Sequence, residues 1–145
     1  MKVIVGDIWK FRSVAIPTNG IVKANGRAVM GAGIFRNTCS KFLGIDSVLG
    51  RDIKYYGNIS LWLGRWDGYN IFSFPTKNHY SESSSSSLIT QSATRLVGLV
   101  ISLRIKEEIA LPAVGCGLGN LNWIRDVEPI LNDILSDQYV VCLKP

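Results

Sequence analysis

Short β-branched segments alternate along this chain with segments of helical periodicity, and this alternation constrains the fold more than any other feature. Such alternation is typical of α/β domains, in which helices cover both faces of a central sheet. The expected strands are residues 2–8, 13–17, 58–66, 69–74, 108–112 and 139–143. The expected helices are residues 32–43, 88–103 and 123–135. The pattern predicts an α/β fold: a three-layer α/β/α sandwich with a central mixed sheet of about six strands.

Two local signals sharpen this prediction. Asp67-Gly68 stands between two alternating apolar runs, which predicts a β-hairpin. The serine run from Ser83 to Ser87 precedes a helical segment, so one of its serines can cap that helix. No linker, repeat or change of composition divides the chain, and we expect a single domain over residues 1–145.

The composition narrows the classes of protein. With 47% apolar and 19% charged residues, the chain is globular rather than disordered. No apolar run reaches the roughly 18 residues of a membrane span, and Asp7 interrupts the first strand too early for a signal peptide. Three cysteines without CxxC spacing indicate reduced thiols in a cytoplasmic protein. We expect no metal, no cofactor, no membrane partner and a monomer.

The net charge favours anionic partners. The formal charge is +5, which suits nucleic acid, phosphate-bearing ligands or acidic proteins. The basic residues are scattered, however, and an ordinary solvated surface explains them equally well.

Polar side chains follow the first two expected strands. In open α/β sheets the ligand crevice lies at the carboxyl ends of the strands. The Asp7 carboxylate could accept hydrogen bonds from an exocyclic amine such as that of adenine, or could simply end its strand as a turn residue. The Asn19 amide both donates and accepts, which suits the hydroxyl groups of a ribose.

Two glycine-rich segments also follow strands. Gly31, Ala32 and Gly33 let the backbone approach a ligand closely, and the helix that they open directs its amides toward an anion. The alternative there is a plain loop rich in turn formers. Between residues 115 and 119, glycines stand at alternate positions, which a nest of amides around a diphosphate explains better than packing. Neither a P-loop nor a GxGxxG fingerprint fits, and Cys116 reads as a small loop residue without an activating partner.

A third loop begins with Lys77, directly after the strand expected at residues 69–74. Lys77 could contact a phosphate, attack a sugar as a nucleophile, or be a surface lysine. A lysine is a nucleophile only if burial or a neighbouring cation lowers its pKa. The single histidine, His79, reads as a surface or structural residue rather than a general base.

Taken together, these segments resemble the macro domain family. The matching motifs are GDIW at residues 6–9, PTNG at 17–20, MGAG at 30–33, FPTK at 74–77 and LPAVGCGLGNLNW at 111–123. They occur in the family's order and span nearly the whole chain. The subgroup that the sequence resembles most contains the DNA-ADP-ribosyl glycohydrolases and the terminal ADP-ribose protein glycohydrolases. Small phage-encoded macro proteins are similar as well.

The resemblance implies roles for individual residues. Asp7, with the Ile8 backbone, would hold adenine; Asn19 and residues Gly31, Ala32 and Gly33 would contact the distal ribose. Lys77 matches the lysine implicated in attack at the anomeric carbon. Members that cleave protein esters carry an aspartate where this chain has Gly119, whereas DNA-directed members do not need it. The residues implied to wrap the diphosphate and ribose are Val114, Gly115, Cys116, Gly117, Leu118, Gly119 and Asn120.

Three functions remain open at this point. The first is binding of ADP-ribose, or a derivative, with hydrolysis of an ADP-ribosyl linkage on DNA or protein, for which Lys77 and Asn19 are the candidate catalytic residues. The second is a binding module without catalysis, either a reader of ADP-ribose marks or a sponge for an ADP-ribose-derived signal. The third is a phosphatase acting on ADP-ribose 1''-phosphate.

Overall fold

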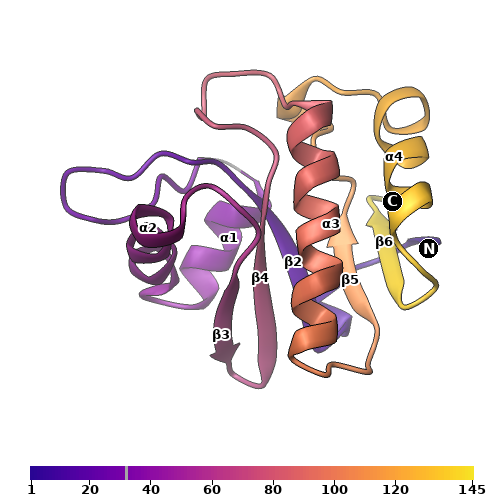
Figure 1. Ribbon diagram of the computed structural model, residues 1–145, viewed down its shortest axis with the longest axis horizontal. Coiled ribbons are helices and arrows are strands. Elements are labelled where there is room, and N and C mark those ends of the chain that lie inside the picture. The colour runs from indigo at the N-terminus through magenta and orange to yellow at the C-terminus, as the bar shows by residue number, and fades with distance from the viewer. Residues whose placement is uncertain (32) are drawn as a thin grey trace.

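A computed structural model describes residues 1–31 and 33–145, and it contains a mixed sheet of six strands with four α-helices (Figure 1). The strands are β1 (Lys2–Val5), β2 (Ser13–Thr18), β3 (Trp62–Trp66), β4 (Tyr69–Pro75), β5 (Ile109–Pro112) and β6 (Tyr139–Leu143). The helices are α1 (Ile34–Lys41), α2 (Ile45–Tyr56), α3 (Ser86–Ser102) and α4 (Glu128–Ile134). The strand order is β1-β6-β5-β2-β4-β3, and among the neighbouring strands of the described sheet only β3 and β4 pair antiparallel.

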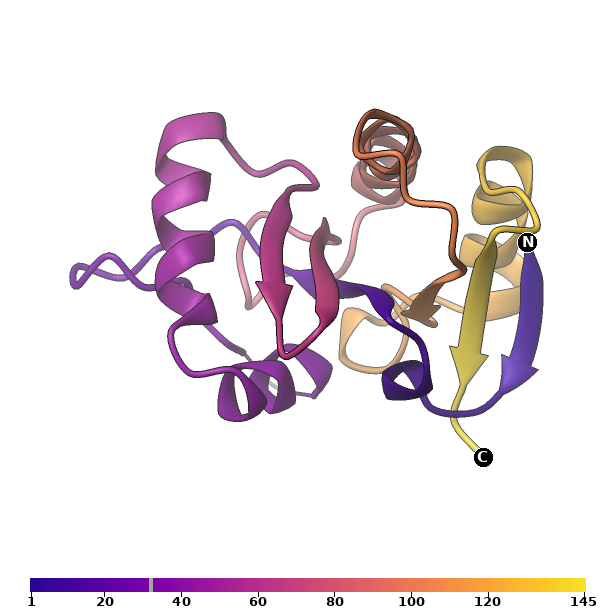
Figure 2. The ribbon, with the colours of Figure 1, turned by 90° about the horizontal axis from the view of Figure 1, so that it is seen from below.

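The helices cover both faces of the sheet, so the three-layer prediction is confirmed (Figure 2). Successive residues of a strand point to opposite faces, and the central strand β2 shows this directly. Val14 and Ile16 pack in one apolar cluster with Leu49 of α2, whereas Ala15 packs in the other with Leu96 of α3. All five side chains are buried, so β2 lies in the middle of the core.

The predicted hairpin is confirmed. β3 and β4 pair antiparallel, and the turn between them places Asp67 at φ 51° and Gly68 at φ 82°. Two successive positive φ angles are what a type I′ turn requires, which explains the preference for Asp-Gly at this point.

The predicted serine cap is present too. Ser85 Oγ accepts a hydrogen bond from the Leu88 N–H at 3.2 Å, and α3 begins at the next residue, Ser86.

The region after residue 32 differs from the prediction. The helix expected over residues 32–43 is shorter, Ile34–Lys41, and a second helix that was not predicted, α2, follows it. Gly44 separates the two helices in a left-handed conformation at φ 95°, which favours glycine. Ile45, Leu49 and Ile53 of α2 are spaced by four residues and bury one face against the sheet. Ala32 lies outside the described residues.

The helix predicted over residues 123–135 is not regular. It begins as a π-helical turn, Trp123–Val127, and becomes α-helical only at Glu128. Pro129 lies in the first turn of α4 and has no N–H to donate, so it is tolerated at a helix start and not in a helix interior.

Three strands are shorter than expected, β5 by one residue at its start and β1 and β3 by more. β1 stops at Val5 because Asp7 caps a 3-10 helix over Ile8–Lys10. β3 begins only at Trp62; just before it, the Leu61 N–H donates to Ser73 Oγ at 2.9 Å and not to a main-chain oxygen. Among the described residues, we find no helix long and apolar enough to span a membrane.

Candidate functional site

A cleft of about 1100 Å³ opens at the carboxyl ends of the parallel strands. Its lining comes from the segments after β1, β2, β4, β5 and β6 and from the start of α1. Parallel strands end at one edge of the sheet, which is where open α/β folds bind ligands. The volume is ample for a small molecule the size of a dinucleotide.

One end of the cleft carries a carboxylate. Asp7 Oδ1 accepts a hydrogen bond from the Trp9 N–H at 2.9 Å, which holds the side chain in place, and no described residue donates to Oδ2. Ile8 is buried beside it, and Cys142 lies close enough that burial and the charge of Asp7 raise the pKa of its thiol. A fixed carboxylate with a spare oxygen can accept a hydrogen bond from an amino group of a ligand.

Asn19 organises the loop after β2, residues 19–31, which we call the first glycine loop. Its Nδ2 donates to the Val29 carbonyl oxygen at 3.1 Å, and its Oδ1 accepts from the Ile21 N–H at 3.0 Å. Asn19 as a whole residue is 7% exposed. Asn19 therefore ties the two ends of the loop together, and one N–H and one oxygen lone pair remain for a ligand.

The end of this loop is open toward the cleft. Gly31 and Gly33 have φ angles of 62° and 68°, and a Cβ built on either would meet no described atom within 4 Å. The backbone alone limits these positions, because left-handed conformations favour glycine. Both residues line the cleft, so a ligand can approach their main chain closely.

Helix α2 holds the same loop from behind. A Cβ on Gly50 would collide with the Gly26 carbonyl oxygen, so helix and loop pack backbone against backbone. The Ala28 N–H donates to the Asp46 carbonyl oxygen at 2.9 Å, and Arg27 forms an ion pair with the Asp46 carboxylate at 3.5 Å. The loop and α2 therefore form one packed unit.

The second glycine loop, residues 115–120, follows β5. Gly115 has φ 77°, and a Cβ there would lie 2.8 Å from Cδ1 of Ile89, so a larger residue would be both strained and crowded. A short 3-10 helix over Gly117–Gly119 follows. The first N–H groups of a helix have no intrahelical partner, so the amides of Gly117 and Leu118 can receive an anion.

Cys116 and Val114 differ in their placement. Cys116 lines the cleft, but burial, followed by the charge of Asp126, raises the pKa of its thiol, which disfavours the nucleophilic thiolate. Val114 does not line the cleft: its side chain is buried in the core, and its N–H donates to the Pro112 carbonyl oxygen at 2.8 Å.

The third loop begins with Lys77 and is held at both ends. Asn58 Nδ2 donates to the Lys77 carbonyl oxygen at 3.2 Å, while Lys77 Nζ donates to the Tyr80 carbonyl oxygen at 3.5 Å. Glu82 Oε1 accepts from the His79 N–H at 2.6 Å. These bonds keep Lys77, Tyr80 and Glu82 at the cleft wall.

His79 orders this loop. Its Nδ1 accepts a hydrogen bond from the Ser81 N–H at 3.1 Å, and its ring stacks on Tyr80 with centroids 4.3 Å apart. The structure therefore places His79 in a structural role.

Two hydroxyl groups beside the cleft have no hydrogen-bond partner among the described residues: Thr18 Oγ1 and Ser84 Oγ. Buried polar atoms are nearly always paired. Both residues contribute to the cleft lining, so unused hydrogen-bonding capacity lies next to the ligand space.

The structure brings most of the predicted residues together. Those that line the cleft are Asp7, Ile8, Asn19, Gly31, Gly33, Lys77, Gly115, Cys116, Gly117, Leu118, Gly119 and Asn120. Val114 lies in the core beneath it, and Ala32 lies outside the described residues. Lining residues that the sequence reasoning missed include Trp9, Phe35, Tyr80, Glu82, Ser84 and Lys144. Several of these follow strand ends, which was the one signal that could have found them. Within the described residues, no three His, Cys, Asp or Glu side chains are grouped to hold a metal ion.

Solved structures with the same arrangement cover this chain from end to end. The macrodomain of Mycobacterium tuberculosis DarG is 25% identical, with a TM-score of 0.79 over 99% of this chain and 97% of that one. The macrodomain of Thermus aquaticus DarG is 22% identical, with a TM-score of 0.78 and the same coverages of 99% and 97%.

A third structure contains a ligand. Thermosipho africanus DarTG in complex with ADP-ribose is 22% identical, with a TM-score of 0.77 over 99% of this chain. This chain spans 41% of that protein's length. No family model matches the chain, and no curated protein matches it.

Proposed function

Because this chain has the macrodomain fold, we propose that its cleft binds ADP-ribose or a close derivative. The observation that carries the proposal is the meeting of Asp7, two glycine loops and Lys77 around one cavity of about 1100 Å³. A structural neighbour, the DarTG protein of Thermosipho africanus, was solved in complex with ADP-ribose. The positive charge of the chain, +5, suits a ligand with two phosphates.

In this proposal each part of the ligand lies beside the cleft residues that can bind it. Asp7 Oδ2 accepts from the adenine amino group. The diphosphate lies against the amides of Gly117 and Leu118, which have no intrahelical partner. The distal ribose lies between the Asn19 loop and Lys77, both of which line the cleft.

We further propose that the chain hydrolyses an ADP-ribosyl linkage on a macromolecule, DNA or protein. Lys77 Nζ gives up a proton to water and attacks the anomeric carbon as the bond to the linked group breaks. The bonding electrons leave on the linked atom, which takes a proton from water. Water then hydrolyses the lysyl adduct, which releases ADP-ribose and restores the amine. Asn19 orients the ribose for this attack.

Position 119 of the second glycine loop is a glycine and supplies no carboxylate. A Cβ on Gly119 would collide with Ser84 Oγ, so an aspartate cannot replace glycine there without a rearrangement. The described carboxylates in the lining are Asp7 at the far end and Glu82, which is bonded to the His79 N–H. This observation favours a second candidate function, a reader that binds ADP-ribose without cleaving it.

Calorimetry and a release assay separate these functions. Titration with ADP-ribose should show binding, and its absence would overturn the whole proposal. Incubation with ADP-ribosylated single-stranded DNA and with an ADP-ribosylated protein should release ADP-ribose from one of them. Lys77→Ala should keep binding within a few-fold and lose release. Binding without release from either substrate would support the second candidate function, a protein that binds ADP-ribose marks without cleaving them.

A further inference from the structure

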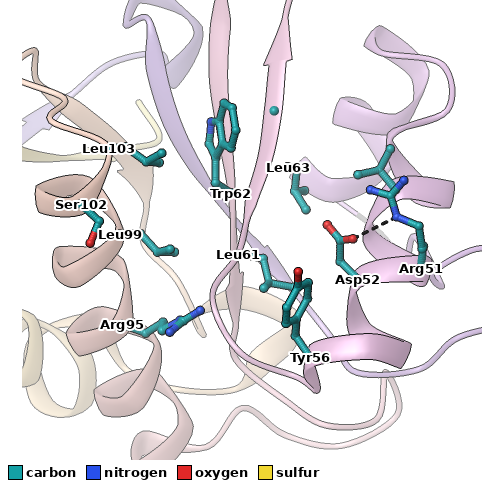
Figure 3. Close-up of a pocket in the computed structure, with 12 residues that line it drawn as sticks. Arg51, Asp52, Tyr56, Leu61, Trp62, Leu63, Arg95, Leu99, Ser102 and Leu103 are labelled. Carbon is teal, nitrogen blue, oxygen red and sulfur yellow. Dashed lines mark hydrogen bonds and ion pairs between the residues drawn. The ribbon is translucent and has the colours of Figure 1, made fainter.

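A second hollow of about 530 Å³ lies away from the strand ends, at the free edge of β3 (Figure 3). We call it the edge groove. Its floor includes Leu61 and Leu63, and its sides are formed by α2 and α3. Figure 3 shows Arg95 reaching inward from α3 while Tyr56 and Arg51 stand on the α2 side.

The cations of the edge groove are arginines. Arg95 Nε donates to the Ser60 carbonyl oxygen at 3.2 Å, which fixes the guanidinium while its terminal nitrogens stay available. Arg51 lies on the opposite side, and its side chain is 72% exposed. It forms an ion pair with Asp52, and no other carboxylate lines the groove among the described residues. Arginine binds phosphate in a planar, bidentate manner and stacks on rings. Two further arginines, Arg65 and Arg104, are each one residue from the lining.

Two exposed aromatic rings also line the edge groove. Trp62 is 40% exposed and Tyr56 57% exposed, although both side chains are large and apolar. Trp62 Nε1 donates to Asn70 Oδ1 at 3.2 Å, so the indole plane is fixed before any ligand arrives. Fixed rings beside arginines are the features with which proteins bind single-stranded nucleic acid.

The edge of β3 is unsuited to an added peptide strand. The pairing register shifts between Trp62 and Arg65, and Gly64 has φ 103°. Such a bulge twists an edge and blocks strand addition. The edge groove therefore suits a strand bound through its bases and phosphates better than an acidic peptide bound through its main chain.

One residue links the end of α2 to the loop that begins with Lys77. Tyr56 is the last residue of α2, and Asn58, two residues later, donates to the Lys77 carbonyl oxygen at 3.2 Å and to Asn78 Oδ1 at 3.0 Å. Asn58 therefore joins the end of α2, which lines the edge groove at Tyr56, to the loop that carries Lys77.

We propose that the edge groove binds the unpaired nucleic-acid strand that flanks the nucleotide carrying ADP-ribose. Arg95 and Arg51 contact its phosphates, and Trp62 and Tyr56 stack on its bases. This inference rests on the proposed function, because it extends the substrate of the cleft to a nucleic-acid strand.

The test measures the anisotropy of labelled, unmodified oligo(dT) and oligo(rU) with the full chain saturated with ADP-ribose, which leaves the edge groove as the open site. Arg95→Gln should weaken binding several-fold and reduce the slope of log affinity against log salt by about 0.7 for each phosphate that the variant no longer neutralises. Trp62→Ala should weaken binding by about five-fold or more, and Trp62→Phe should retain most of it. Lys23→Gln, equal in charge change and outside both hollows, should match the parent.

The outcomes separate the two proposals. Tight binding of ADP-ribose with no oligonucleotide binding, or with Arg95→Gln and Trp62→Ala both equal to the parent, overturns the edge groove and leaves the cleft intact. If the protein binds poly-glutamate more tightly than the oligonucleotides, and this binding weakens in Arg95→Gln, the edge groove is not a nucleic-acid site. Failure of ADP-ribose to bind overturns the proposed function, and with it the role of the edge groove beside an ADP-ribosylated nucleotide; oligonucleotide binding that still depends on Arg95 and Trp62 would then show a strand site that is independent of the cleft. A difference between oligo(dT) and oligo(rU) identifies which strand the edge groove accepts.

Discussion

Ser84 packs directly against Gly119 and leaves no room for a side chain there. Ser84 donates its N–H to the Gly119 carbonyl oxygen at 2.9 Å, and its Oγ fills the position that a Cβ on Gly119 would take. The contact joins the segment before α3 to the second glycine loop, and both line the cleft. A side chain at position 119 must therefore disturb the wall of the cleft.

Gly119→Ala should lower the free energy of unfolding by about 1–3 kcal/mol, the usual cost of overpacking, and should weaken ADP-ribose binding. Ser84→Gly removes the clashing hydroxyl, so the double variant should recover much of both losses. Denaturant unfolding and calorimetry measure the cycle. Equal losses in the single and double variants would show that the contact does not limit position 119.

Asp7→Asn should change the base that the cleft prefers. The asparagine Oδ1 can still accept from the Trp9 N–H, so the 3-10 helix keeps its cap. Its Nδ2 donates instead of accepting, which suits the oxygen of hypoxanthine and opposes the amino group of adenine. We expect ADP-ribose affinity to fall about 10-fold while affinity for the inosine analogue rises. Equal affinities in parent and variant would remove Asp7 from the adenine site.

Cys116 should be the first thiol to be alkylated. Cys39 and Cys142 are buried, and burial raises the pKa of Cys39 to about 12. Cys116 is half-buried, and burial raises its pKa as well, so its reaction should be slow at neutral pH and accelerate in alkali. Because Cys116 lines the cleft, saturating ADP-ribose should slow the reaction. Mass spectrometry of iodoacetamide-treated protein reports each site, and an unchanged rate with ligand would contradict the proposed binding mode.

Asp126 should stabilise the fold in a pH-dependent manner. Hydrogen bonds from Arg125 and from the Asn122 N–H lower the pKa of Asp126 from 3.8 to about 2. A group whose pKa is lower in the folded state stabilises above its unfolded value and loses that contribution as pH falls through the folded value. The stability difference between parent and Asp126→Asn should therefore shrink as pH falls from about 4 toward about 2.

Asp133→Asn is the control for that experiment, because no ion pair of Asp133 is found among the described residues. A carboxyl titration of Asp126 near its ordinary value, followed by NMR, would refute the prediction.

Local signals predicted the parts of the fold that depend on local chemistry. Asp67-Gly68 has the residues that a type I′ turn needs, and Ser85 has the hydroxyl that a helix start needs. Residues 139–143 are a continuous apolar run, and β6 has those bounds. In each case the physical cause lies within a few residues, so the sequence suffices.

Helix α2 was missed although Ile45, Leu49 and Ile53 are spaced for one face. Gly50 obscures the pattern because glycine is a poor helix former. Its reason is tertiary: a larger residue would collide with the Gly26 carbonyl oxygen. No local pattern contains that contact.

The sequence predicts which loops form the cleft, but not how several of their side chains are placed. Strand ends located Asp7, Asn19 and Lys77 at the cleft wall. The hydrogen bonds of Asn19 to its own loop, and the burial of Val114 below the cleft, depend on how the loops fold back. The edge groove depends on α2 and α3, which lie far apart in the sequence, so no motif indicates it.

The backbone contact between Gly50 and Gly26 has an energetic consequence. Helix α2 presses on the loop that walls the cleft and also forms one side of the edge groove. A ligand in one hollow that shifts this helix changes the free energy of occupying the other. Such a linkage is reciprocal: the factor by which ADP-ribose alters the affinity for a strand equals the factor by which the strand alters the affinity for ADP-ribose.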